Sequence, residues 1–176
     1  MNDVKNFGLY DSTFEKSSCG VGFLTRKDGK QTHELLVKGH EALCAVPHRG
    51  GMSAEGVGDG AGVSIDLSVT FFSRVVGTSL VPGEFGVGNF FLPNNKSQHV
   101  RAKKLIDDAL KSEGMITLIT RSVDVDDSVL RPAAIRYQLP IAQWVFAAPK
   151  GIRGAALEKR IHKALLSIES EAYIDE

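Results

Sequence analysis

Hydrophobic and polar positions alternate, or gather into short apolar runs, at several places along this chain, and both patterns are typical of β-strands. The segments with this character are 20–26, 63–67, 86–92, 115–120 and 141–148. A helical pattern falls between the third and fourth of them. Residues from about 86 to 148 are therefore predicted to form a β-α-β-β layer inserted into the domain.

Apolar side chains that recur every three or four residues predict three helices. These helices are expected over 32–46, 97–112 and 155–173. In the first helix, Thr32 can cap the free N–H groups, and Cys44 is expected to face the core. Pro47 ends this helix because it cannot donate a backbone hydrogen bond.

Composition bounds the class of protein. The chain has 176 residues, which suits one domain, and its 21 basic side chains balance 21 acidic ones. This charge balance argues against nucleic acid or an anionic membrane surface as a partner. No apolar run approaches the roughly 18–20 residues that cross a membrane, and no hydrophobic signal core begins the chain. With only two cysteines, we expect a cytoplasmic protein.

Cys19 is the most reactive candidate in the sequence. It follows a polar stretch, residues 1–18, which is interpreted as a leader or propeptide. If this leader were removed, the thiol and a free α-amine would share one carbon, and the amine, with a pKa of about 7.7–8.0, could act as the base. The alternative interpretation is that Cys19 is a small buried hydrophobic residue.

Motifs around Cys19 resemble those of a known family. A Cys-Gly-Val-Gly-Phe stretch, a helix, His-Arg-Gly and Gly-Asp-Gly-Ala-Gly follow one another, as at the start of class II glutamine amidotransferases. Tyr-Asp and Phe-Glu-Lys ahead of the cysteine resemble the glutaminase domain of the glutamate synthase large subunit. These motifs occupy residues 19–23, 33–46, 48–50, 58–62, 10–11 and 14–16.

The resemblance implies a fold and a reaction. The fold is α+β, a four-layer αββα sandwich of the N-terminal-nucleophile type, of which residues 19–176 would form the N-terminal part. In the reaction, Cys19 attacks the side-chain amide of glutamine, ammonia leaves, and water hydrolyses the thioester to glutamate. Arg49 would lie beside the nucleophile, and His48 is assigned to packing.

Two later motifs of the family are absent from these 176 residues. One is His-x-Arg-(Tyr/Phe)-Ser-Thr, which binds glutamine, and the other is His-Asn-Gly-Glu, which forms the oxyanion hole. An oxyanion donor stabilises a transition state by roughly 3–4 kcal/mol, so the chain is expected to be nearly inactive alone. A chain that has the nucleophile but lacks these motifs could be a truncated piece, a split-gene subunit or a reduced paralogue. The alternative function is a non-catalytic assembly or regulatory module with the same fold.

Cofactors and partners follow from the same resemblance. FMN and an iron–sulfur cluster are implied only for a complete glutamate synthase, and this chain is expected to hold no cofactor and no metal. His33, His40 and His48 lack the i,i+4 spacing of a helical metal-binding pair. Glutamine is the expected substrate, in glutamate biosynthesis and nitrogen metabolism. A partner chain or a second copy is expected to complete the fold, because missing strands would expose sheet edges.

Overall fold

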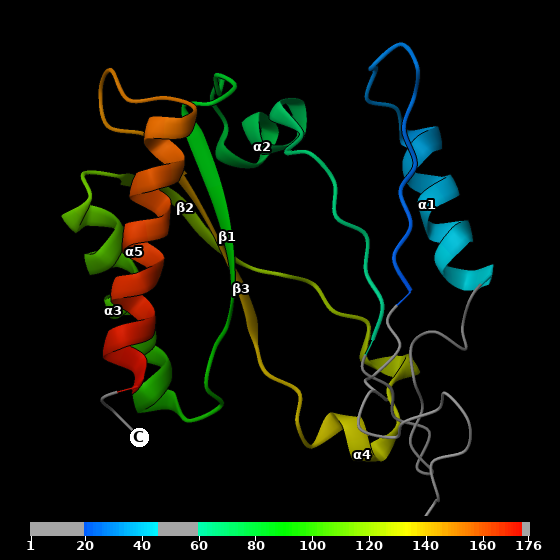
Figure 1. Cartoon of the computed structure of the whole chain (residues 1–176). Coiled ribbons are helices and arrows are strands. Elements are labelled where there is room, and N and C mark those ends of the chain that lie inside the picture. Colours follow the sequence, from blue (N-terminus) through cyan, green and yellow to red (C-terminus); the bar gives the residue numbers. More distant parts are fainter. Residues whose placement is uncertain (1–19, 46–59, 174–176) are drawn as a thin grey trace, which may run out of the picture. The chain divides into compact units, whose positions relative to one another are not determined.

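A computed structural model describes residues 20–45 and 60–173 of the chain (Figure 1). The chain divides into two compact units, Met1–Ile65 and Asp66–Glu176. Each unit is described by itself below. None of the helices in the described ranges is long and apolar enough to cross a membrane.

The second unit is built on a three-stranded antiparallel sheet. Its strands are β1 (Phe85–Phe91), β2 (Ile116–Ser122) and β3 (Ile141–Ala147), and β3 lies between the other two. Helix α3 (Lys96–Ser112) connects β1 to β2. The predicted β-α-β-β order is therefore present, and the described part of the chain is a mixed α/β structure with a small antiparallel sheet.

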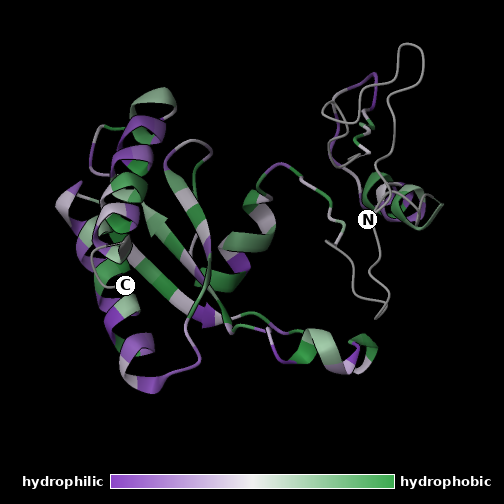
Figure 2. Cartoon of the chain, turned by 60° about the horizontal axis from the view of Figure 1, so that its bottom comes forward, coloured by the Kyte–Doolittle hydropathy of each residue, from purple (hydrophilic) through white to green (hydrophobic). Residues whose placement is uncertain are grey.

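Helices cover both faces of this sheet. Figures 1 and 2 show α3 and α5 (Ala155–Tyr173) on one face and α2 (Val69–Val76) on the other. Because strand side chains alternate between the two faces, β3 supplies both cores. Ala142, Trp144 and Phe146 pack with α3 and α5, whereas Val145 packs with Phe72 of α2.

Trp144 is the centre of the larger core. Its side chain has no exposed surface, and its ring meets Phe90 edge-on with the two ring centroids 5.2 Å apart. The indole N–H donates to Asp107 Oδ1 of α3 at 2.9 Å, and the Thr117 hydroxyl donates to the same oxygen at 3.2 Å. The apolar strand pattern around Trp144 predicts a position in the core or at an interface, and the structure places it in the core.

A row of polar side chains crosses the opposite face of the sheet. Gln143 of β3 donates to Asn89 of β1 at 2.9 Å and accepts from Arg121 Nε of β2, also at 2.9 Å. The Arg121 guanidinium lies 5.7 Å from the centre of the Phe71 ring. Gln143 is buried, so these two hydrogen bonds satisfy a side chain that would otherwise be costly to desolvate.

The long helices of the second unit match their predicted spans, with two differences in detail. The sequence predicts Ser97 as the cap of α3, but the cap is Asn95, whose side chain accepts from the N–H groups of both Ser97 and Gln98. On α5 the three- and four-residue spacing predicts a buried stripe that includes Leu165, but Leu165 is 42% exposed and Ala164 is buried.

In the first unit, α1 (His33–Ala45) forms as predicted. Thr32 accepts a 3.4 Å hydrogen bond from the N–H of Leu35, and Lys38 forms a 2.8 Å ion pair with Glu34. The predicted strands at 20–26 and 63–67 are wrong, because neither segment adopts strand structure. A strand requires a hydrogen-bonded neighbour, and the described residues of this unit provide none.

Two short elements lie between β2 and β3. A 3₁₀ turn, η3 (Asp127–Val129), is capped by Asp126, and α4 (Pro132–Ile135) begins with a proline at its first position. The Ser128 side chain and N–H both donate to Asp126, and these hydrogen bonds lower the pKa of that carboxyl group. The sequence from Asp124 to Asp127 predicts a polar loop, and the structure shows an ordered turn there.

Candidate functional site

The two residues predicted to be catalytic, Cys19 and Arg49, lie outside the described residues. The structure does describe their flanks. Residues 20–26 follow Cys19 directly, α1 ends four residues before Arg49, and Gly60 to Gly62 close the glycine-rich motif. These three segments are the parts of the motif region that the structure describes.

The segment after Cys19 is open to solvent. Val21 is 95% exposed and Phe23 is 92% exposed. A Cβ atom placed on Gly22 would meet no atom within 4 Å, so the backbone at this position can be approached closely. Such access suits a nucleophile that must receive a substrate.

A charged turn closes this segment. The Gly29 N–H donates to the Arg26 carbonyl at 3.0 Å, and Gly29 has a φ of 66°, which favours glycine. Arg26 donates to both carboxylate oxygens of Asp28, at 2.9 and 2.8 Å. The hydrogen bond from Arg26 lowers the pKa of Asp28 and raises that of the guanidinium. The Lys-Asp-Gly-Lys sequence at 27–30 predicts a hairpin-type turn or short loop, and the structure has a turn there.

Val63, which directly follows the glycine-rich motif, lies against α1 at Gly39. A Cβ atom at Gly39 would lie 3.7 Å from Val63 Cγ1, which is van der Waals distance. The segment that continues from Gly62 therefore runs beside α1 within the first unit.

Cys44 does not lie in a core. Its thiol is free and exposed near the end of α1, so the prediction that it faces the interior is wrong. The Sγ atom lies 3.7 Å from His40 Nε2, one helical turn earlier. Sequence reasoning missed this pair because it compared histidines only with each other; the i,i+4 spacing of His40 and Cys44 was the available signal.

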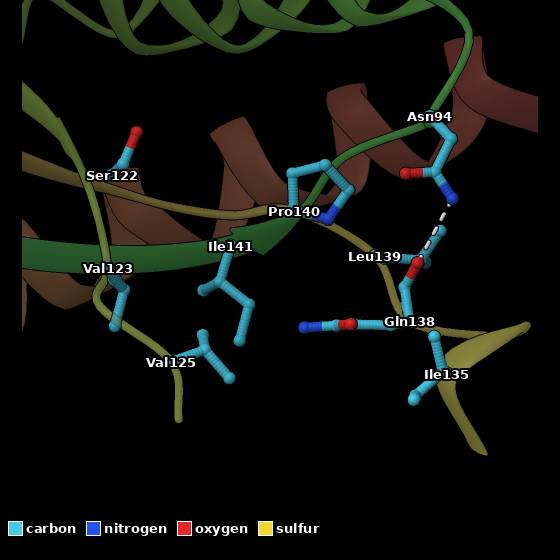
Figure 3. A pocket seen from close by; sticks show the side chains of 9 residues that line it. All are labelled: Asn94, Ser122, Val123, Val125, Ile135, Gln138, Leu139, Pro140 and Ile141. Carbon is cyan, nitrogen blue, oxygen red and sulfur yellow. Dashed lines mark hydrogen bonds between the residues drawn. The ribbon is translucent and has the colours of Figure 1, made fainter. Parts of the chain in front are cut away.

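A shallow pocket of about 360 Å³ lies in the second unit, beside the start of β3 (Figure 3). Val123, Val125 and Ile141 point toward one another, and the Asn94 side chain donates to the Gln138 carbonyl at 3.0 Å. The nine lining side chains include no thiol, histidine or charged group. This pocket offers space but none of the chemistry that the Cys19 motif implies.

Comparison with known proteins identifies the class. Residues 19–175 match the family of class-II glutamine amidotransferases, and the match begins at Cys19. Because this match covers most of the chain, the protein belongs to that family. The expectation drawn from the motifs is therefore confirmed at this level.

Its relatives are glutamate synthases. The chain is 34% identical over 145 residues to the NADH glutamate synthase of Saccharomyces cerevisiae. The aligned region covers 77% of this chain and 7% of the relative. It is 33% identical over 122 residues to the NADPH glutamate synthase large chain of Bacillus subtilis, with 68% of this chain and 8% of the relative covered. It is 33% identical over 155 residues to ferredoxin-dependent glutamate synthase 2 of Synechocystis, with 85% of this chain and 10% of the relative covered. The chain therefore spans a tenth or less of these relatives.

Proposed function

We propose that this chain carries the nucleophile of a glutamine-hydrolysing site, with Cys19 as the attacking residue. The observation that carries the proposal is the family match, which starts at Cys19 itself. The thiolate would attack the side-chain amide carbon of glutamine and expel ammonia, leaving a γ-glutamyl thioester. Water would then cleave the thioester, releasing glutamate and restoring the thiol.

The proposed base is the α-amine of Cys19, which is free only after cleavage between Ser18 and Cys19. An amine with a pKa of about 7.7–8.0 can accept the thiol proton near neutral pH and return it to the leaving ammonia. Three residues after Cys19, the exposed backbone at Gly22 leaves room for a substrate. Arg49 is proposed to hold this region in place.

We further propose that the ammonia feeds a synthase reaction elsewhere, since the relatives are named glutamate synthases. The setting would be cytoplasmic, with a partner chain or second copy completing the sandwich. No cofactor is assigned to these residues. With two cysteines, one of them the proposed nucleophile, the chain does not offer the four thiolates that usually hold an iron–sulfur cluster.

A glutamine-like diazoketone, which alkylates an activated active-site thiol, tests the proposal. We expect one label per processed chain, located at Cys19 by peptide mass, and no label in Cys19→Ala. Cys44→Ser is the matched control because it removes the other thiol and should label normally. Hydrolysis of glutamine by these 176 residues alone should be near background, since the glutamine-binding arginine and the Asn-Gly donor are absent from them.

The alternative, a non-catalytic assembly or regulatory module, predicts a different pattern. Cys19 would then keep its preceding peptide bond and remain unlabelled, while the chain would still fold. Labelling at Cys44 instead of Cys19 would also contradict the proposed function, because it would show a generally reactive thiol in place of a site.

A further inference from the structure

His40 and Cys44 form a pair of metal-ligating side chains on the solvent-exposed side of α1. They lie one helical turn apart, and both are exposed. The Nε2 atom of the imidazole and the Sγ atom of the thiol are 3.7 Å apart. Both atoms carry lone pairs that a metal ion could use, in the Nδ1–H tautomer of the histidine and the thiolate form of the cysteine.

The separation of these two atoms fits one tetrahedral zinc ion. Zinc lies about 2.0–2.1 Å from an imidazole nitrogen and about 2.3 Å from a thiolate sulfur. At the tetrahedral angle, two such ligands are therefore about 3.6 Å apart. The observed separation of 3.7 Å needs almost no rearrangement. We propose that His40 and Cys44 chelate a divalent ion of the zinc class.

The rest of the helix is compatible with this site. Glu34 and Lys38 are paired with each other, so their charges do not compete for the ion. In the ranges that the structure describes, no group of three or more histidine, cysteine or acidic side chains gathers. The described residues therefore supply two ligands to the proposed site, and water is proposed to complete the coordination. Binding would release the thiol proton to solvent and form one metal–sulfur bond.

This proposal is independent of the function assigned to Cys19. The chain has two cysteines, so Cys44 becomes the sole thiol when all samples carry Cys19→Ala. Cobalt(II) is a suitable probe because it occupies zinc sites and gives an ultraviolet charge-transfer band when a thiolate binds it. We expect this band to appear on titration of the full chain, and excess zinc to remove it.

Variants separate chelation from binding by a single thiol. His40→Ala and Cys44→Ser should each weaken cobalt binding by about tenfold or more, since even the outer partners of metal ligands contribute that much. His33→Ala, an exposed histidine on the same helix, should change nothing. Circular dichroism of each variant checks that the helix remains.

The sharpest control moves the thiol by one residue. The double variant Cys44→Ser/Ala45→Cys keeps both ligand types, but it turns the thiol about 100° around the helix, away from His40. We expect the chelate affinity to be lost. Equal affinity in this variant, or unchanged affinity in His40→Ala with the helix intact, would overturn the proposal.

Discussion

The two units of this chain differ in how they treat their hydrophobic side chains. In the second unit, the central strand β3 is buried on both faces, with Trp144 and Val145 having no exposed surface. In the described part of the first unit, α1 buries no side chain, and Phe23 is 92% exposed. The unit with the core carries no predicted catalytic residue, whereas none of the described residues of the unit with the motifs is buried.

This difference separates the packed core from the predicted catalytic residues along the sequence. The second unit obtains its stability from contacts among its own elements, as the cores on both faces of the sheet show. In the described part of the first unit, the apolar side chains of Val21, Phe23 and Ile65 are exposed and form no packed core. Changes in the two units should therefore have very different effects on folding.

The largest effect is expected for Trp144→Ala. The change empties the core and removes the hydrogen bond to Asp107, so the free energy of unfolding should fall by about 3–5 kcal/mol. Urea denaturation followed by circular dichroism measures this loss. Phe23→Ala is the comparison from the first unit and should stay within about 0.5 kcal/mol of the parent. Equal losses of unfolding free energy in the two variants would contradict the difference between the two units.

A smaller effect is expected for Gly86→Ala in β1. The new Cβ atom would lie 2.5 Å from Phe146 Cε2, and Phe146 is buried and cannot easily move. We expect a loss of about 1–3 kcal/mol, the usual result of overpacking. Gly22→Ala meets open space and should leave the unfolding curve unchanged. Fluorescence of Trp144, the one tryptophan of the chain, reports on the Gly86 variant, and circular dichroism follows both variants.

The smallest effect is expected for Glu34→Gln on α1. Hydrogen bonding and charge attraction from Lys38 lower the pKa of Glu34, so any stabilisation is present above its unfolded pKa and is lost as the pH falls through the folded value. Both side chains are exposed, so we expect no measurable shift in Tm at neutral pH. A clear drop in Tm would contradict the exposed position of this ion pair.

Sequence patterns predicted the second unit well because its apolar runs are long and bounded by turns. Helix α2 was missed, since Val69, Phe71 and Phe72 belong to residue types that favour strands. The residues that cap α2 indicate the helix better than the residues within it. The Ser68 side chain accepts from the N–H of Phe71, and Gly77 has a φ of 78° in the left-handed region that ends helices.

The first unit was harder to predict for a physical reason. The alternation at 20–26 indicates which side chains can be buried, but it does not supply the neighbouring strand that would bury them. Cys44 was assigned to a core by residue type alone, and the structure places it in solvent beside His40. Motif order identified the family, whereas Cys19 and Arg49 lie outside the described residues and their roles stay predictions.

The central claim is that Cys19 becomes the first residue of the working protein. N-terminal sequencing of the protein isolated from the cells that make it tests this claim most directly. We predict that the chain begins Cys-Gly-Val-Gly-Phe, with the thiol and the α-amine on one residue. A natural protein that still carries residues 1–18 would contradict the account, because the proposed base would remain locked in a peptide bond.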